Sequence, residues 1–344
     1  MLSLIKVGVV GYGTIGKRVA DAVNMQDDMK LVGVVVRRYD WRASMALRRR
    51  YKLYVSADAD LESFRLNKID YEGTVEDLLG NVDVVVDATP KGVGAKNKTL
   101  YEKFGVKAVF EGGEKHEVAG VSFIATRNYD EAYGKQYVRV VSCNTTAIGR
   151  VIGALHEKIG VKRAYISIVR RAADPWESHR KGIINTVVPT LKVPSHHGPD
   201  VRSVIKDLNI VTMAVVSSHN LYHLHMGFIE LKESLNRNRI LQVLEEEPRV
   251  VLVRGNDGIA ALNSLFELGR DLGRSRGDIY EIPVWEESIK VEGNNVYLMW
   301  MTPNESNVVP DNVDAIRAIT MSESDPSRSI EKTDKALGIL SKLY

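Results

Sequence analysis

Cysteine is almost absent from this sequence, since Cys143 is the only one in 344 residues. A single cysteine excludes an internal disulfide and a zinc site built from several thiolates, and such sparing use is typical of a reducing cytosol. No apolar run approaches the length of a membrane-spanning helix, and no cationic region precedes the first apolar stretch, as a signal peptide would require. We therefore expect a cytoplasmic protein without a membrane partner.

A large excess of charge of either sign is also lacking. The sequence has 47 Lys and Arg residues against 44 Asp and Glu residues, a net charge of +3, which gives no reason to expect a nucleic-acid partner. Basic residues gather in RRYDWRASMALRRRYK (37–52), and such a run is typical of a solvated face. The length favours two domains, and we predict no metal site.

Short valine-rich runs alternate with helical patterns in the first half of the chain. They lie at 5–10, 30–36, 81–89, 106–110 and 137–142. Near-continuous apolar strands are buried on both faces, which indicates a parallel sheet covered by helices. We therefore predict an α/β fold whose first domain is a Rossmann-type, doubly wound parallel sheet.

The second half of the chain carries longer and partly alternating runs, at 162–171, 209–217, 223–231 and 294–302. This pattern predicts a second, α+β catalytic domain with a mixed or antiparallel sheet. The tail from about Pro310 is expected to be helical, with Asp311 as the cap of its first helix.

The segment GYGTIG (11–16) matches G-x-G-x-x-G between an expected strand and an expected helix. Gly11 would form the tight turn, Gly13 would let the backbone approach a pyrophosphate, and Gly16 would let helix and strand pack closely. The helix N-terminus offers unpaired N–H groups to phosphates. We predict a dinucleotide site here; the alternative is a tight turn without a ligand.

The end of the second expected strand discriminates between NAD and NADP. Arg37 and Arg38 stand in the region where an acidic residue would bind a ribose 2′-hydroxyl, and guanidinium groups suit a 2′-phosphate. We predict that NADP is used at least as well as NAD. Asp40 is close in the sequence and could still accept a ribose hydroxyl, which leaves dual use open.

Cys143 follows an expected strand and precedes a helix predicted over 145–158. The dipole of that helix favours a thiolate at its N-terminus. A thiolate can add to an aldehyde to give a thiohemiacetal, and hydride transfer to a nicotinamide then leaves a thioester. The reaction also needs a base. Two groups of histidines are candidates: His196 and His197, and His219, His223 and His225.

A set of motifs carries a family resemblance over nearly the whole chain. They are GYGTIGKRVADAV, DATPKGVGAKN, EGGEKHE, SCNTTAIGR, RRAADP, PSHHGPDV, HLH and VVPDNVDAIRA, in this order. Together they resemble the archaeal type of phosphorylating glyceraldehyde-3-phosphate dehydrogenase. The resemblance implies phosphorylating oxidation of D-glyceraldehyde 3-phosphate to 1,3-bisphosphoglycerate with NAD(P) and inorganic phosphate, in glycolysis or gluconeogenesis, by a homotetramer. It also implies a dinucleotide-binding domain at 1–142, joined by the C-terminal helix 304–344, and a catalytic domain at 143–303.

The resemblance also implies roles for individual residues. Cys143 is the expected nucleophile and His223 the expected base. Ser142 and Asn144 would hold the aldehyde end of the substrate with Cys143, and His196 and His197 its phosphate region. Arg170 is a further candidate for binding phosphate, because a guanidinium group suits phosphate oxygens. The residues expected to contact the dinucleotide are Thr14, Ile15, Gly113, Arg171 and Asn304.

Departures from the family pattern leave alternatives open. Before HLH the family usually has Pro-Thr-Thr, whereas this chain has an extra histidine, His219, so His219 or His225 could replace His223 as the base. Asn304 stands where glutamine is more usual. A sister enzyme, such as an aspartate-semialdehyde dehydrogenase or an N-acetyl-glutamyl-phosphate reductase, is the first alternative function. A non-catalytic nucleotide-binding sensor is the second.

Overall fold

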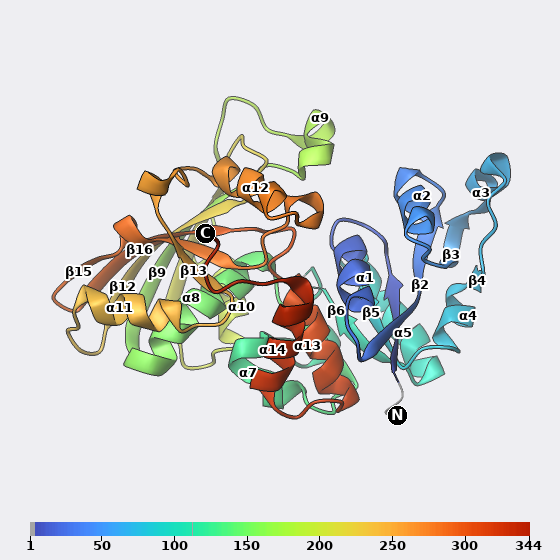
Figure 1. Cartoon of the computed structure of the whole chain (residues 1–344), viewed down its shortest axis with the longest axis horizontal. Helices are drawn as coiled ribbons and strands as arrows, with labels where there is room; N and C mark the ends of the chain where they lie inside the picture. Colours follow the sequence, from blue (N-terminus) through green and yellow to red (C-terminus); the bar gives the residue numbers. More distant parts are fainter. Residues whose placement is uncertain (1–3, 112) are drawn as a thin grey trace. The chain divides into compact units, whose positions relative to one another are not determined.

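The computed structural model describes residues 4–111 and 113–344, and the chain divides into two compact units (Figure 1). Unit 1 takes the chain up to Ser142 together with Val309–Gly338, and unit 2 takes Cys143–Val308 together with Ile339–Tyr344. Residues 304–308 and 339–344, which the sequence analysis assigned to the returning C-terminal segment, therefore belong to unit 2.

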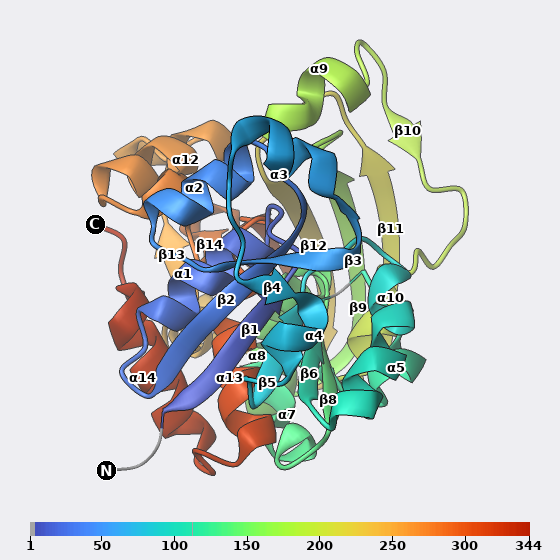
Figure 2. The same cartoon turned by 90° about the vertical axis from the view of Figure 1, so that its right-hand side faces the viewer.

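Within the described residues, unit 1 contains one sheet of eight strands in the order β4-β3-β2-β1-β5-β6-β8-β7, and every pairing in it is parallel (Figure 2). The predicted Rossmann-type sheet is confirmed. The valine-rich strands lie at its centre, where helices cover both faces. The strands are β1 (Ile5–Val10), β2 (Met29–Arg38), β3 (Leu53–Asp60), β4 (Gly73–Thr74), β5 (Val84–Asp87), β6 (Lys107–Phe110), β7 (Ser122–Phe123) and β8 (Tyr137–Val140).

The helices of unit 1 come from both ends of the chain. They are α1 (Gly16–Asn24), α2 (Trp41–Arg48), α3 (Leu61–Asn67), α4 (Val75–Leu79), α5 (Val93–Phe104), α6 (His116–Ala119), α7 (Ala125–Ala132), α13 (Val309–Thr320) and α14 (Pro326–Leu337). The C-terminal helix α13 packs against α1, α7 and α14. Asp311 was expected to cap this helix, but α13 already begins at Val309, and the buried Asp311 carboxylate instead accepts a hydrogen bond from the Ala125 N–H (2.9 Å).

Unit 2 has a mixed sheet, as predicted. Its strands follow the order β10-β11-β9-β12-β16-β14-β13, with β15 paired to β16; β11 and β9 are parallel, as are β13 and β14, and the other pairs are antiparallel. The strands are β9 (Val161–Arg170), β10 (Val188–Pro189), β11 (Ile210–Val216), β12 (His223–Leu231), β13 (Val250–Val253), β14 (Ile282–Trp285), β15 (Lys290–Glu292) and β16 (Asn295–Thr302). The α-helices are α8 (Cys143–Ile159), α9 (Ser178–Lys181), α10 (His197–Arg202), α11 (Arg237–Glu245) and α12 (Leu262–Asp271). Short 3-10 helices are η1 (Pro175–Glu177), η2 (Gly255–Asp257), η3 (Ser275–Gly277) and η4 (Glu286–Ser288).

The two faces of this mixed sheet differ. Helix α8 packs against β9, and α10 and α11 pack against α8, so helices cover one face (Figure 1). In β12 burial alternates strictly along the strand, so that His223 and His225 point to the covered side. On the opposite face, Met301 is buried against residues of α12, whereas Tyr165 on β9, Met213 on β11 and Met299 on β16 are exposed.

Candidate active site

The glycine loop between β1 and α1 has the geometry that a dinucleotide requires. Gly11 has a φ of +91°, and a Cβ added to Gly16 would lie 1.8 Å from the Gly11 carbonyl oxygen, so both positions require glycine. A Cβ added to Gly13 would meet nothing within 4 Å, because this position faces open space. The three glycines therefore fit the roles predicted for them: a turn, a close approach to a pyrophosphate, and tight packing of helix on strand.

The other predicted cofactor residues of unit 1 lie on loops that follow the strands. Thr14 and Ile15 connect the glycine loop to α1, and Ile15 is the N-cap residue of that helix. A Cβ added to Gly113 would lie 3.6 Å from Lys91 Cα, which brings the loop after β6 next to the loop after β5. Gly112, part of the predicted EGGEK loop, lies outside the described residues. These loops share the edge at which ligands bind in open α/β sheets.

Arg37 and Arg38 are the last two residues of β2, and both are exposed. Arg37 pairs with the exposed Asp58 (3.2 Å), and Arg38 lies 3.7 Å from Asp40. Asp40 caps α2 and forms an ion pair with Arg42 (2.6 Å), so its carboxylate is already occupied and is a poor ribose acceptor. Exposed ion pairs contribute little to the free energy of folding, so both guanidinium groups can turn towards a phosphate.

Cys143 is the first residue of α8, and Ser142 immediately precedes it. The Asn307 amide donates to the Cys143 carbonyl oxygen (2.9 Å), which fixes the start of the helix. The thiol is partly buried. Burial raises its pKa, and the positive charges of Arg171 and Arg170 oppose this rise without cancelling it. Backbone hydrogen bonds at Asn144 and Cys143 also lower this pKa, and they stabilise the thiolate expected at the start of the helix.

His223, the first residue of β12, is buried and held by the backbone. Its Nδ1 accepts a hydrogen bond from the Arg171 N–H (3.0 Å). Burial lowers its pKa well below the ordinary value, and the charge of Arg171 adds to this, so the ring is neutral. A neutral imidazole that accepts at Nδ1 carries its proton at Nε2. In this arrangement the His223 Nε2–H is available as a hydrogen-bond donor, and the role of His223 as the base stays a prediction.

The two alternative bases are engaged elsewhere. His219 Nε2 lies 3.0 Å from the Tyr222 carbonyl oxygen, to which it must donate, because a carbonyl only accepts. His225 is fully buried, and its Nε2 lies 2.8 Å from Asn144 Oδ1. Burial lowers the pKa of His225 to about 3. His223 bonds the backbone of Arg171, whose charge also acts on the Cys143 thiol.

The candidates for binding substrate fall into two groups. His197 is buried with both ring nitrogens engaged, at 3.2 Å from Asn144 Nδ2 and 3.0 Å from Ser195 Oγ, so it has no free nitrogen for a phosphate. His196 stacks on His197 with ring centroids 3.9 Å apart. Arg170 Nε is buried and has no hydrogen-bond partner among the described residues, which leaves this guanidinium group able to bind an oxyanion.

Arg171 and Asn304, two predicted cofactor residues of unit 2, lie together. Arg171 forms ion pairs with Asp174 and with Glu305 (2.6 Å). With the Asn304 amide in the orientation that satisfies both groups, its oxygen accepts two bonds of 2.7 Å from Arg171. Glu305 and Asn307 carry no motif signal that sequence reasoning could have used.

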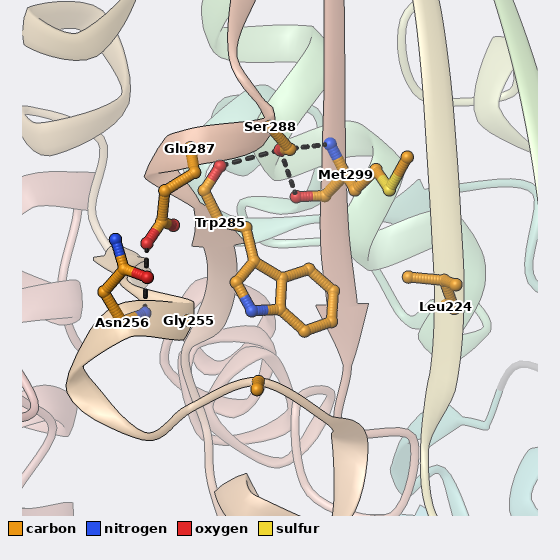
Figure 3. A pocket seen from close by; sticks show the side chains of 8 residues that line it. Leu224, Gly255, Asn256, Trp285, Glu287, Ser288 and Met299 are labelled. Carbon is orange, nitrogen blue, oxygen red and sulfur yellow. Dashed lines mark hydrogen bonds between the residues drawn. The ribbon is translucent and has the colours of Figure 1, made fainter.

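A separate cavity of about 510 Å³ opens in unit 2 (Figure 3). Its lining consists of Leu224, Gly255, Asn256, Ala260, Trp285, Glu287, Ser288 and Met299. The Trp285 indole forms one wall, and its Nε1–H donates to the Ile259 carbonyl (2.6 Å). None of the predicted site residues lines this cavity. Across residues 4–111 and 113–344, no group of three or more His, Cys, Asp or Glu side chains could hold a metal ion, and no helix is long and apolar enough to cross a membrane.

Unit 1 is a Rossmann-type unit with a glycine loop. Unit 2 presents a thiol and an imidazole beside the same two arginines. Together these features define a two-domain nucleotide-dependent dehydrogenase. Comparisons with known proteins agree. A family model described as glyceraldehyde 3-phosphate dehydrogenase, C-terminal domain, matches residues 142–288, and one described as dihydrodipicolinate reductase, N-terminus, matches residues 5–117.

Full-length relatives identify the family. The chain is 49% identical over 335 residues to the glyceraldehyde-3-phosphate dehydrogenase of Methanothermus fervidus, covering 97% of this chain and 99% of the relative. It is 51% identical over 336 residues to that of Thermococcus kodakarensis, covering 98% and 99%. The chain belongs to the glyceraldehyde-3-phosphate dehydrogenase family and is therefore an oxidoreductase.

Solved structures of aspartate semialdehyde dehydrogenase II from Vibrio cholerae share the fold. The two matches have TM-scores of 0.65 and 0.66 at 11% and 12% identity, and each covers 94% of this chain and 100% of the other. At this identity the likeness shows the fold alone.

Proposed function

We propose that this chain catalyses the phosphorylating oxidation of D-glyceraldehyde 3-phosphate to 1,3-bisphosphoglycerate, with NADP or NAD, through a thioester on Cys143. One observation carries the proposal: the single thiol stands at the start of α8, where the positive charges of Arg170 and Arg171 lower its pKa. The family membership and the glycine loop support the same reaction. The bound nicotinamide supplies the hydride acceptor.

The proposed steps follow from the groups at the site. The Cys143 thiol loses its proton to solvent, and the thiolate attacks the aldehyde carbon, which forms a C–S bond and leaves a negative charge on oxygen. The His223 Nε2–H donates to that oxyanion. Removal of one well-placed donor of this kind lowers kcat by about 10²–10³-fold. Loss of hydride from the same carbon re-forms the C=O bond and leaves a thioester. Inorganic phosphate then attacks the thioester carbon and releases the thiolate.

Ser142, Asn144, His196 and Arg170 are proposed to hold the substrate. Arg170 has the strongest support, because its buried Nε is unpartnered and a guanidinium group binds phosphate oxygens in pairs. We assign His197 to the support of Asn144 instead of to direct contact with phosphate, because both of its ring nitrogens are used.

The proposed cofactor site joins the glycine loop to the arginines at the end of β2. Gly11, Gly13 and Gly16 fit a pyrophosphate, and Arg37 and Arg38 fit a 2′-phosphate, which supports NADP as a cofactor used at least as well as NAD. Thr14, Ile15, Gly113, Arg171 and Asn304 are the further residues proposed to contact the dinucleotide.

A homotetramer in the cytoplasm is the proposed state of the protein. The exposed part of the second face of the unit 2 sheet supports association between copies, because Tyr165 on β9, Met213 on β11 and Met299 on β16 are 37%, 53% and 43% exposed. Figure 2 shows the loop that carries α9 and β10. Two further apolar side chains of this loop, Ile184 and Leu191, are 86% and 87% exposed. Sedimentation velocity of the purified chain should give four copies, and Met213→Lys should weaken the assembly; a wild-type monomer contradicts this proposal.

A direct assay tests the proposed reaction. The purified protein should reduce NADP and NAD with glyceraldehyde 3-phosphate and inorganic phosphate, and it should show no comparable rate with aspartate semialdehyde. Cys143→Ser should abolish the activity. Full activity in Cys143→Ser rules out the covalent route, and a preference for aspartate semialdehyde favours the sister enzymes. A protein that binds NADP but turns over neither aldehyde, and whose thiol does not react with iodoacetate at neutral pH, is a sensor.

A further inference from the structure

A chain of buried polar side chains runs through unit 2 and includes Asn144, the residue that follows the nucleophile. We call it the Asn144 relay; its members are Thr212, Ser195, His197, Asn144 and His225. Thr212 Oγ1 lies 2.8 Å from Ser195 Oγ, which lies 3.0 Å from His197 Nδ1. Asn144 then bridges two rings, with Nδ2 at 3.2 Å from His197 Nε2 and Oδ1 at 2.8 Å from His225 Nε2. Every member is at most 3% exposed, so these bonds form away from bulk water.

Two backbone groups determine the direction of donation at one end of the relay. The Gly198 N–H donates to Thr212 Oγ1 (2.9 Å), and the Ser195 carbonyl oxygen, 3.1 Å from the same hydroxyl, can only accept. The Thr212 hydroxyl therefore gives its proton to that carbonyl, and the Ser195 hydroxyl must donate to Thr212. With its only proton used, Ser195 Oγ accepts from the His197 Nδ1–H.

The same logic continues to Asn144. Burial lowers the pKa of His197 to about 2, so the ring is neutral and its Nε2 must accept from Asn144 Nδ2. Asn144 Oδ1 then faces His225, whose Nε2–H donates to it. His225 Nδ1, which is buried and has no partner among the described residues, is left as a lone pair instead of an unsatisfied N–H. Only one orientation of the Asn144 amide satisfies all of these bonds.

We propose that the other four members of the Asn144 relay are positioning residues, which fix the Asn144 amide and with it the first turn of α8 at Cys143. The relay uses one Nδ2 hydrogen of Asn144, and the second donates to no side chain of the relay. One part of the proposal rests on the proposed function: this second hydrogen donates to the carbonyl oxygen of an aldehyde attached to Cys143. A flipped amide would present its oxygen to the growing negative charge there and oppose the reaction.

Thr212 allows the relay to be tested from its far end. Thr212→Val keeps the shape and removes the hydroxyl, whereas Thr212→Ser keeps the hydroxyl. Loss of one ordered hydrogen bond of about 1–1.5 kcal/mol corresponds to about a tenfold change in rate. We expect Thr212→Val to lower the alkylation rate of Cys143 by iodoacetamide and the kcat with glyceraldehyde 3-phosphate by about tenfold each, and Thr212→Ser to stay within about twofold of wild type.

The controls separate positioning from loss of stability and from failure of the proposed function. Thr333→Val in unit 1 also removes a fully buried, hydrogen-bonded hydroxyl, and it should lower the melting temperature without changing the alkylation rate. Alkylation needs neither substrate nor cofactor, so it tests the relay even if the wild-type protein fails to oxidise glyceraldehyde 3-phosphate.

A second pair of variants acts at the opposite end. His225→Leu removes the donor to Asn144 Oδ1, and His225→Gln keeps an N–H near the Nε2 position. Because both ends act on the same amide, Thr212→Val and His225→Leu should be non-additive, with the double variant no slower than the slower single variant. Additive effects, or a Thr212→Val protein that matches wild type in both rates, would overturn the proposal.

Discussion

Replacing Gly16 by alanine should damage the fold of unit 1, whereas the same change at Gly13 should damage only the binding of the cofactor. The added Cβ at position 16 would lie 1.8 Å from the Gly11 carbonyl oxygen. Ordinary contact distances are about 3.5 Å, so helix and loop must separate by roughly 1.7 Å. A forced shift in a packed contact costs about 3 kcal/mol or more, which corresponds to a fall in melting temperature of about 6–12 °C for a unit of this size.

Gly13→Ala is the matched control, because its Cβ would meet nothing within 4 Å and the residue does not have a positive φ. Thermal unfolding should therefore be unchanged, while a methyl group in the pyrophosphate path should weaken NADPH binding by at least about tenfold, or 1.4 kcal/mol. Both values are measurable by scanning fluorimetry and by titration of NADPH fluorescence. Equal loss of stability in the two variants, or wild-type NADPH affinity in Gly13→Ala, would refute this account of the loop.

Three further predictions concern the site and the fold. His223→Asn should slow acylation by at least about a hundredfold, and His223→Gln should recover at least about a tenth of wild-type activity, because it keeps an N–H near Nε2; equal losses in stopped-flow kinetics would refute the donor role. Arg38→Ala should raise the KM for NADP by about tenfold and leave the KM for NAD unchanged, and a shift in both would contradict binding of a 2′-phosphate. Burial raises the pKa of Asp28, but the hydrogen bond and charge of the fully buried Arg317, helped by Lys332, outweigh it and hold this pKa below its ordinary value. The pair therefore stabilises the protein above about pH 4, and this stabilisation is lost as the pH falls through the lowered pKa. Arg317→Met should lower the free energy of unfolding, measured with urea at pH 7, by about 3–5 kcal/mol. An unchanged free energy of unfolding would contradict the role of the pair.

The sequence was most informative where one pattern determined one structure. Valine runs buried on both faces predicted β1, β5 and β6, and the alternating pattern predicted β12 with the bounds that it has, His223–Leu231. The glycine loop could be predicted because each of its glycines meets a local steric demand. The short strands β13 and β14 were not predicted, although the apolar runs VVLV and IPVW were available, because a run of four residues does not distinguish a strand from other buried segments.

The protonation pattern of the site could not be predicted from the sequence. The role of His223 depends on the Arg171 N–H, which lies 52 positions away in the chain, and that of His197 depends on Asn144, 53 positions away. Tautomers are set by such three-dimensional partners and not by residue type or spacing. Residue spacing therefore located the histidines, whereas the fold determined which nitrogen carries a proton.

The central claim is that the Cys143 sulfur carries the substrate as a thioester. The most direct test mixes the protein with glyceraldehyde 3-phosphate and NADP in the absence of phosphate, quenches with acid and analyses the peptides by mass spectrometry. The account predicts one 3-phosphoglyceroyl group on the peptide that contains Cys143, and its loss when phosphate is added before the quench. Turnover without any adduct, or an adduct on another residue, would contradict it.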